Sequence, residues 1–303
     1  MTKHLSIMPS KAIQMLGIKE DGIYVDGTLG RGGHSKLILE KLNSNGKLYC
    51  FDIDSQAIQE SKEVLKDYKN VEYIHDNYAN MGKYIDKVDG ILLDLGVSSP
   101  QFDEADRGFS YRFDGPLDMR MNLDDEISAY EVINNYSKER LEDVLRNYGE
   151  ERNYKRIVAK IIESRPIKTT LELVDVIKSA LPAKVLSKKG HPAKQTFQAI
   201  RIEVNQELDS LKKFLEDFPE YLNEDGRLVI ISFHSLEDRL VKRRFKNLST
   251  VQDDLRINLR PEEIKKADFE LLNHGDKADQ EEIELNHRAK SAIIRGIKRV
   301  WQK

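Results

Sequence analysis

The 303-residue chain has one cysteine, one tryptophan and no long hydrophobic run. The single cysteine, Cys50, excludes a disulfide framework and a cysteine-rich zinc site, so we expect no metal. No apolar stretch approaches the roughly 20 residues that cross a bilayer, and the N-terminus shows no signal-peptide core. These absences predict a cytoplasmic protein that has no membrane partner.

The chain also lacks an excess of charge of one sign. Its 49 basic and 52 acidic residues give a formal net charge of -3. A protein that coats nucleic acid through its overall field is usually basic, so any RNA binding must come from local patches. With 39% hydrophobic and 33% charged residues, the composition is typical of a globular enzyme. The oligomeric state leaves no signal in the sequence.

Short apolar runs alternate with helical stretches over the first hundred residues. This rhythm predicts a parallel sheet covered by helices, that is, an α/β fold. The expected elements are strands at 23–26, 47–52, 71–74 and 90–94, helices at 35–42 and 57–68, and later strands at 227–233 and 291–295. The charged stretch from about 249 to 286 is predicted to form excursions on the surface.

A helical block separates the two groups of strands. Apolar residues at helical spacing predict three helix faces, at 154–162, 173–181 and 197–211. Thr169 and Glu172 form the spacing of a capping box before the second of them. We therefore expect a discontinuous α/β domain of residues 1–102 and 210–303, interrupted by a helical insertion at 103–209.

A glycine-rich turn, residues 26–34, follows the first expected strand. Glycines there let the backbone approach a ligand closely. A Walker A loop that starts at Gly27 would need lysine where Gly33 stands. A dinucleotide fingerprint that starts at Gly30 would need glycine or alanine where Ser35 stands. Neither pattern fits.

Asp52 ends the second expected strand, about 20 residues after the glycine turn. In this topology such a carboxylate accepts hydrogen bonds from ribose hydroxyls. S-adenosylmethionine, a nucleoside cofactor without a pyrophosphate, fits the turn and the acid together. The alternatives are an NAD-dependent oxidoreductase, and a turn followed by an ordinary aspartate at the end of a strand.

Two further motifs stand at expected strand ends. Asp94 begins the loop 94–101, and ligands of open α/β sheets bind beyond the carboxyl ends of the strands. Asp94 is thus predicted to face the same edge as Gly32 and Asp52, although a Ser-Ser-Pro turn would explain the loop alone. In the motif 232–239 we predict Ser235 as a helix N-cap. His234 is either a hydrogen-bonded structural residue or a catalyst, and the first is favoured.

Basic residues gather locally in the insertion, around Lys188 and Lys189. Such runs are usually solvated helix faces. Beside a binding site they can follow a phosphate backbone, with Tyr111 or Phe197 available for stacking on a base.

In order along the chain, the segments 26–35, 90–101, 107–110, 114–121, 148–152, 196–202 and 231–239 resemble the bacterial small-subunit rRNA cytosine-N4 methyltransferases, the MraW/RsmH family. The resemblance implies a class I, Rossmann-like methyltransferase sheet with a substrate-recognition insertion. It implies methylation of a cytidine in the decoding region of 16S rRNA of the small ribosomal subunit. The family's S-adenosylmethionine positions correspond to Gly32, Gly33, His34, Asp52, Tyr78, Asp94 and Gln101.

The sequence departs from the family pattern at two places. The N-terminal segment at residues 4–9 differs from the family's usual His-x-Pro-Val-Leu-Leu, and His287 stands where the family tends to have proline. The cofactor motifs are untouched by either change.

For the chemistry, we hypothesise that Asp94 accepts a hydrogen bond from the cytosine amino group. Ser98 and Ser99 would support it in the substrate site, with Lys188, Lys189 and His234 as further substrate contacts. Methylation at C5 needs a thiolate, and Cys50 lies inside an expected strand, so we reject it. A non-catalytic RNA-binding assembly factor is the remaining alternative.

Overall fold

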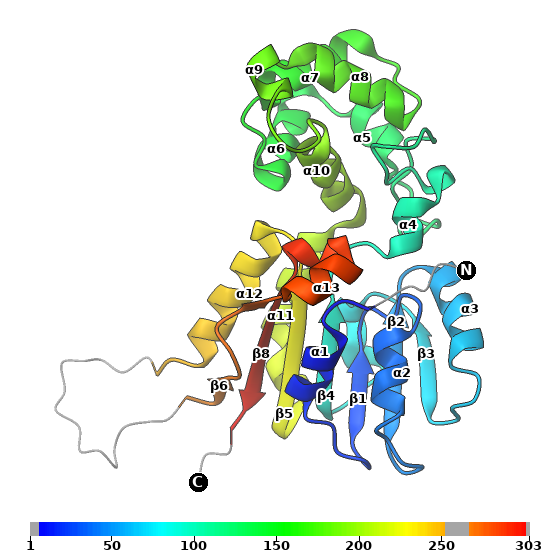
Figure 1. The fold of residues 1–303 in the computed structure, drawn as a ribbon, viewed down its shortest axis with the longest axis vertical. Helices are drawn as coiled ribbons and strands as arrows, with labels where there is room; N and C mark the ends of the chain where they lie inside the picture. Colours follow the sequence, from blue (N-terminus) through cyan, green and yellow to red (C-terminus); the bar gives the residue numbers. More distant parts are fainter. Residues whose placement is uncertain (1–5, 252–266, 301–303) are drawn as a thin grey trace, which may run out of the picture. The chain divides into compact units, whose positions relative to one another are not determined.

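The computed structural model describes residues 6–251 and 267–300. The chain divides into two compact units, one of Met1–Gly96 and Leu208–Lys303 and one of Val97–Glu207. Both are shown in Figure 1. Within the described residues, no helix is both long and apolar enough to span a membrane.

The first unit is built on one eight-stranded sheet in the order β3-β2-β1-β4-β5-β8-β6, with β7 paired to β8. Its strands are β1 (Ile23–Asp26), β2 (Lys47–Asp52), β3 (Val71–His75), β4 (Val88–Asp94), β5 (Leu222–Ser232), β6 (Phe269–Leu271), β7 (Asp276–Lys277) and β8 (Ile293–Arg299). The strands β1 to β5 run parallel, and β8 is antiparallel to its neighbours β5 and β6. The α/β fold with a parallel sheet is confirmed.

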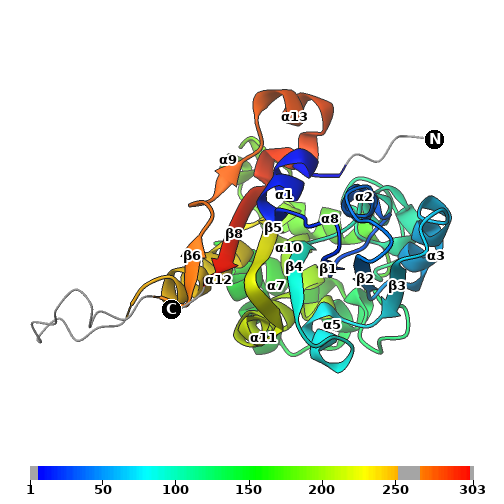
Figure 2. The ribbon, with the colours of Figure 1, turned by 90° about the horizontal axis from the view of Figure 1, so that it is seen from below.

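Helices cover both faces of this sheet because its strands are apolar on both sides. The helices α1 (Pro9–Leu16), α2 (Gly33–Leu39) and α3 (Ser55–Val64) share one core with one face. The helices α11 (Glu207–Tyr221) and α12 (Ser235–Leu248) and the 3-10 turn η1 (Tyr78–Lys83) share a second core with the other face. Figure 2 shows these two layers with the sheet between them.

The charged stretch after Ser249 contains more structure than the sequence predicts. Strands β6 and β7, the helix α13 (Gln280–Leu285) and the 3-10 turn η4 (His287–Ser291) all fall within or next to it. Residues 252–266 of this stretch lie outside the described residues. Strands of three and two residues are too short to give a period in the sequence, and they form because β8 offers them a partner.

The second unit is helical. Its elements are α4 (Ser99–Asp103), η2 (Ala105–Arg107), α5 (Ala129–Asn135), α6 (Lys138–Gly149), α7 (Tyr154–Ser164), α8 (Thr170–Ala180), α9 (Ala183–Leu186) and α10 (Lys194–Asn205). The capping box of Thr169 and Glu172 at the start of α8 is confirmed. The apolar face predicted at 154–162 is buried in α7 through Ile157, Val158 and Ile161.

The third predicted helix face, at 197–211, belongs to two helices rather than one. The chain leaves α10 at Gln206, whose φ of 49° is left-handed, and α11 begins at the next residue. A left-handed residue ends an α-helix. The apolar spacing continues across the break, so the sequence pattern could not reveal it.

Phe214 anchors the core between the sheet and α11. Its side chain is fully buried, and the centroid of its ring lies 5.6 Å from the ring centroid of Tyr78 and 5.9 Å from that of Phe218.

We expect Phe214→Ala to lower the free energy of unfolding by about 3–5 kcal/mol, because the substitution leaves a large cavity in this core. Urea unfolding of Leu285→Ala is the control; that side chain is 75% exposed, and its change should stay within about 0.5 kcal/mol. Equal losses in the two variants would contradict this assignment of the core.

Candidate active site

Parallel pairing brings three aspartates to one edge of the sheet. β1 lies between β2 and β4, and each of the three strands ends in an aspartate: Asp26, Asp52 and Asp94. The glycine turn leaves β1 at this edge and leads into α2. Asp52, Asp94 and the turn that contains Gly32 therefore lie at the same edge, as the spacing of the motifs predicts.

Asp26, whose side chain is buried, anchors the glycine turn through two hydrogen bonds. One carboxylate oxygen accepts the hydroxyl of Ser35 at 2.7 Å, and the other accepts the backbone N–H of Thr28 at 3.2 Å. Gly30 and Gly32 have φ angles of 51° and 74°, in the left-handed region that favours glycine. A Cβ at Gly30 would have only the Thr28 carbonyl oxygen within 4 Å, so the turn is open on that side.

Asp52 ties the turn to β2. Its Oδ2 accepts the N–H of Gly30 at 2.8 Å, and its Oδ1 accepts the N–H of Asp54 at 2.9 Å. Burial raises the pKa of the Asp52 carboxyl to about 6, although these two hydrogen bonds oppose the shift. Since a carboxylate oxygen can accept more than one hydrogen bond, both oxygens retain acceptor capacity.

Asp94 has a buried acceptor atom with no partner. Its backbone N–H donates to the hydroxyl of Thr28 at 2.6 Å, and its Oδ2 lies 3.6 Å from Nδ1 of His34. Its Oδ1 is buried and accepts no hydrogen bond. Burial raises the pKa of Asp94 well above its usual range, and the carboxylates of Asp26, Glu237 and Glu282 raise it further. A buried acceptor without a protein partner is uncommon in native proteins, and at a strand edge it can accept a hydrogen bond from a ligand or from water.

His34 lies in the first turn of α2, next to Gly33. Its Nε2 is 2.9 Å from the carbonyl oxygen of Ile7, and burial lowers the pKa of the imidazole. Gly33 is pressed against the same N-terminal segment, since a Cβ there would lie 2.1 Å from Oγ of Ser6. The atypical N-terminal segment thus forms one wall of this site. Sequence reasoning missed Ile7, because it contributes a backbone atom that any residue could supply.

Tyr78 lies beside the glycine turn on the other side of the sheet edge. It begins η1, and a Cβ at Gly27 would lie 3.1 Å from its Cβ. Its ring packs edge-on against Phe214. The buried Cys50 is also close, with its Sγ 3.4 Å from the hydroxyl of Ser35, and burial raises the pKa of the thiol well above its usual value. A nucleophilic cysteine needs a lowered pKa, so Cys50 is unsuited to attack a base.

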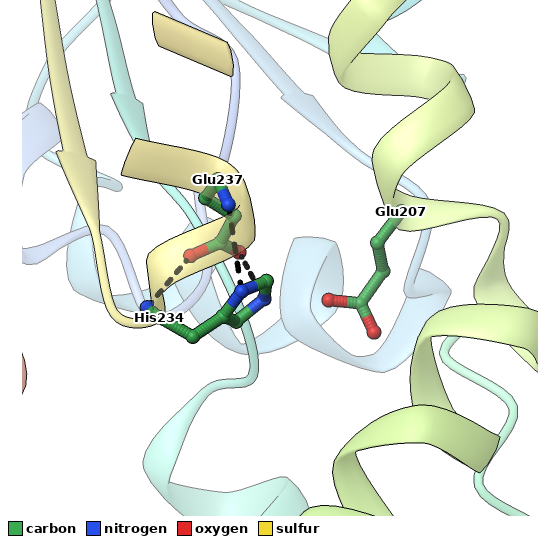
Figure 3. A group of neighbouring side chains, drawn as sticks. All are labelled: Glu207, His234 and Glu237. Carbon is green, nitrogen blue, oxygen red and sulfur yellow. Dashed lines mark hydrogen bonds and ion pairs between the residues drawn. The ribbon is translucent and has the colours of Figure 1, made fainter. Parts of the chain in front are cut away.

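His234 caps a helix, and the prediction of Ser235 as N-cap is wrong by one residue. His234 is the N-cap of α12, and Ser235 is the first helical residue. Glu237 completes a capping box, its Oε2 accepting the N–H of His234 at 3.3 Å and its Oε1 lying 3.1 Å from Nε2 of the imidazole. Figure 3 shows the two side chains together at the start of α12. The capping box explains by local structure why His234 and Glu237 occur in the motif 232–239. A contact of His234 with substrate stays a prediction.

The second unit contains the other predicted site residues. Gln101 is buried in α4, and its Oε1 accepts the N–H of Ser98 at 2.9 Å; Ser99 is the first residue of that helix. Lys188 and Lys189 are exposed between α9 and α10. Close to them the ring of His191 stacks on Tyr111, with centroids 4.4 Å apart.

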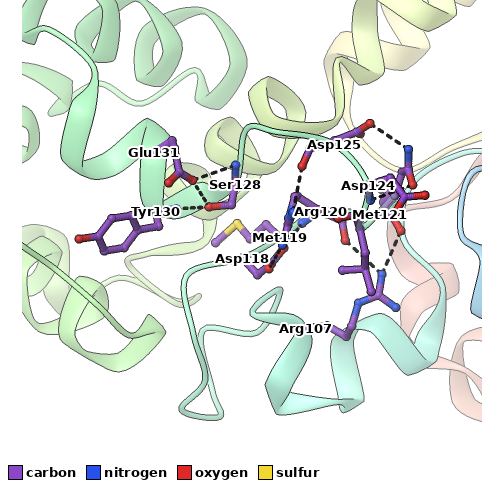
Figure 4. A network of polar contacts seen from close by, with 12 residues as sticks. Arg107, Asp118, Met119, Arg120, Met121, Asp124, Asp125, Ser128, Tyr130 and Glu131 are labelled. Carbon is purple, nitrogen blue, oxygen red and sulfur yellow. Dashed lines mark hydrogen bonds and ion pairs between the residues drawn. The ribbon is translucent and has the colours of Figure 1, made fainter.

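The motifs 107–110 and 114–121 form a loop that is fixed by its own arginines. Arg107 donates to the carbonyl oxygens of Arg120 and Met121, and Arg120 donates twice to the carboxylate of Asp118. Asn205 of α10 closes the loop by accepting the N–H of Met121 at 2.7 Å. Figure 4 shows this network. These contacts, together with the burial of Phe109, Leu117 and Met119, hold the loop in one conformation.

A parallel, helix-covered sheet with an antiparallel strand beside its last parallel strand is a Rossmann-like α/β fold. The MraW methylase family model matches residues 1–300, and the chain belongs to this family, as its motifs predict. It is 51% identical to ribosomal RNA small subunit methyltransferase H of Clostridium botulinum (strain 657 / Type Ba4), over 98% of this chain and 99% of that one. The protein of the same name from Mycoplasma mycoides is 48% identical, over 97% and 98%. A putative rRNA methylase structure from Clostridium thermocellum matches at 14% identity and a TM-score of 0.42, over 99% of this chain and 98% of that one.

The raised pKa of Asp52 makes the stability of the protein depend on pH. The folded pKa of about 6 exceeds the ordinary 3.8, so this contribution is complete below pH 3.8 and is lost as the pH rises through 6. The side chain in Asp52→Asn has no titrating group, so the variant does not lose this contribution as the pH rises. We therefore expect the difference between the two free energies of unfolding, variant minus unaltered protein, to increase by roughly 2 kcal/mol from pH 4 to pH 7.

Urea unfolding of the free protein at several pH values measures this difference. The variant also loses hydrogen bonds of Asp52, but this loss lowers its stability by a similar amount at every pH and so does not affect the change with pH. The exposed Asp86 provides the control, as Asp86→Asn should give a constant difference. A constant difference for Asp52→Asn as well would show that its carboxyl is not buried in this way.

Proposed function

We propose that the chain transfers a methyl group from S-adenosylmethionine to the exocyclic N4 of a cytidine in the decoding region of 16S rRNA. The observation that carries this proposal is the buried, unpartnered Oδ1 of Asp94 at the strand edge that also bears the glycine turn. Membership of a family of methylases, with relatives named for the small ribosomal subunit, supports it. Action on that subunit would take place in the cytoplasm.

The residues of the first unit fit this cofactor. The open side of Gly30 offers room for a ligand against the backbone, and both oxygens of Asp52 can accept further hydrogen bonds, as ribose hydroxyls require. Gly32, Gly33, His34 and Tyr78 would contact the same cofactor, and Gln101 of the second unit stays a predicted cofactor contact. Bound there, the cofactor supplies a methyl group on a positively charged sulfur.

Asp94 would activate the amine. The lone pair of the cytosine amino group is delocalised into the ring, so the nitrogen is a weak nucleophile. An acceptor that takes a hydrogen bond from this group favours the geometry in which the lone pair is available, and Oδ1 of Asp94 is free to do so. Asp94 must be ionised for this role. A cation bound beside it would lower its raised pKa and thereby favour the carboxylate.

The second unit would recognise the RNA. Lys188 and Lys189 are exposed and can contact phosphates, while the stacked rings of Tyr111 and His191 resemble the aromatic platforms on which unpaired bases stack. Burial and the nearby charges of Lys178 and Arg112 lower the pKa of His191, which keeps its ring neutral and suited to stacking. Ser98 and Ser99 of this unit stay predicted contacts to the RNA, as does His234 of the first unit.

Asp94→Asn keeps the shape of the side chain but removes its charge. We expect the rate of methyl transfer to fall by about 10³-fold, since a preorganised acceptor at the reacting group contributes an effect of this size. The assay uses labelled S-adenosylmethionine and small subunits that lack the modification, followed by mass mapping of the methylated nucleotide.

The control is Asp89→Asn, at the opposite end of the same strand, where Asp89 accepts the N–H of Ile23. Its activity per folded molecule should be unchanged. A modified nucleotide other than a cytidine would refute the proposed product, and normal turnover by Asp94→Asn would remove Asp94 from the mechanism.

Replacement of both Lys188 and Lys189 by alanine should weaken RNA binding at low salt. If each contacts one phosphate, the slope of log K against log salt should decrease by about 1.4–1.8. Filter binding or anisotropy over a range of salt concentrations measures the slope. The adjacent lysines Lys212 and Lys213 of α11 form a matched control pair, for which we expect the original slope. A slope unaffected by loss of Lys188 and Lys189 would identify them as solvated surface residues.

A further inference from the structure

The tautomer of His34 is fixed by the backbone of the N-terminal segment. A carbonyl oxygen only accepts hydrogen bonds, so the 2.9 Å contact with Ile7 requires the hydrogen to be on Nε2 of the imidazole. In the neutral ring Nδ1 then carries a lone pair. This lone pair faces Oδ2 of Asp94 at 3.6 Å, which is within ion-pair range but longer than a hydrogen bond.

When no cation lies beside them, two acceptors that face each other at this distance are stabilised by a proton between them. The groups around this pair are acidic: Asp26, Glu237 and Glu282 act on Asp94, and Asp26 also acts on His34. In the part of the chain that the structure describes, Asp94 forms no ion pair with a lysine or an arginine. His34 is thus the group beside Asp94 that can become a cation.

The segment that orients His34 is itself anchored. Ile7 is buried, and the N–H of Met8 donates to the carboxylate of Glu282 in α13. Ser6 lies against Gly33, the residue before His34. The carbonyl of Ile7 is therefore held in place by contacts on both sides, so the ring cannot turn to present Nε2 to Asp94 without breaking a buried hydrogen bond.

We propose that His34 is a positioning residue that receives, through Asp94, the proton released when the cytosine amine is methylated. This inference rests on the proposed function. The bond from nitrogen to the methyl carbon forms as the bond from carbon to sulfur breaks, and the electron pair of the broken bond stays on sulfur. Asp94 removes one proton from the now cationic nitrogen and passes it to Nδ1 of His34, which leaves a carboxylate beside an imidazolium.

This assignment keeps the charge of the buried site constant. Before the reaction, the carboxylate of Asp94 faces one positive charge on sulfur. Afterwards the sulfur is neutral, and the positive charge resides on His34. Because a buried carboxylate without a compensating charge is costly, transfer of the proton to His34 stabilises the state that follows the chemical step.

The first test needs no RNA and no turnover. The pKa of His34 is measured by NMR of the ring nitrogens in two complexes, with S-adenosylmethionine and with S-adenosylhomocysteine, which lacks the positive charge. We expect a higher pKa for His34 in the second complex and the Nε2–H tautomer in the first. Equal pKa values in the two complexes, or an Nδ1–H tautomer, would overturn the proposal.

The second test is the pH profile of His34→Gln. This variant keeps a polar side chain that can donate to Ile7 but cannot take a proton at neutral pH. We expect methyl transfer at pH 7 to fall by about 10²-fold, with a deficit that shrinks as the pH rises, because hydroxide replaces the missing acceptor. A deficit that is equal at every pH would mean a structural role and would refute the inference.

His75→Gln is the matched control, since Nε2 of His75 makes the same kind of contact, 3.0 Å from the carbonyl oxygen of Ile53. Its profile should equal that of the unaltered protein. If 16S rRNA is not methylated at all, while the pKa of His34 still differs between the S-adenosylmethionine and S-adenosylhomocysteine complexes, the proposed substrate is wrong. The role of His34 as proton acceptor is then still supported. If methylation succeeds without that difference, only the role of His34 fails.

Discussion

Three carboxylates that are withdrawn from water at three adjacent strand ends, Asp26 fully buried and Asp52 and Asp94 half-buried, are the constraint on which this site depends. Asp26, Asp52 and Asp94 all have a pKa raised by burial, and among the described residues none of them pairs with a lysine or an arginine. Hydrogen bonds from the glycine turn and from Ser35 offset part of the cost for Asp26 and Asp52. Of the described basic side chains, His34 alone lies within ion-pair distance of one of these carboxylates. The pyrophosphate of NAD would bring two further negative charges to this acidic edge, which argues against the oxidoreductase alternative.

The residues that hold the turn are also those predicted to contact the cofactor. Asp52 accepts the N–H of Gly30, so it fixes the backbone against which a cofactor would lie while it offers further acceptor capacity. Thr28 donates its N–H to Asp26 and accepts that of Asp94, linking two of the three strand ends. The geometry of the glycine turn and the strand ends is therefore set by short contacts within the sheet edge.

Much of this arrangement follows from the sequence, for local reasons. Strand periodicity and the glycine turn identify the elements, and the rule that parallel strands end at one edge brings Asp52 and Asp94 together. The capping residue of α12 could not be chosen in this way. His234 and Glu237 have the spacing of a capping box, but so do Ser235 and Asp238, and only the fold reveals that Asp238 instead pairs with Arg295.

Other contacts leave no trace in the sequence at all. The carbonyl of Ile7 reaches His34 across 27 residues, and the N–H of Met8 reaches Glu282 across 274. Backbone atoms carry no residue signature, so periodicity and motif spacing cannot report such contacts. The departure of residues 4–9 from the family pattern was the one available signal, and it falls on the segment that orients His34.

The acidity of the strand edge also constrains how RNA can be bound. A phosphate brought to Asp26, Asp52 and Asp94 would meet charges of its own sign, whereas a cytosine is neutral and presents an amino group that donates hydrogen bonds. If the substrate is the proposed cytidine, only its base can enter the edge without this repulsion, so the cytidine would be unpaired or flipped from its stack and its phosphates would be bound by other residues. In a chain with a net charge of -3, such binding would depend on local basic side chains such as Lys188 and Lys189. Discrimination between bases would then depend on the acceptor at Asp94, because uracil has no amino hydrogen to donate there.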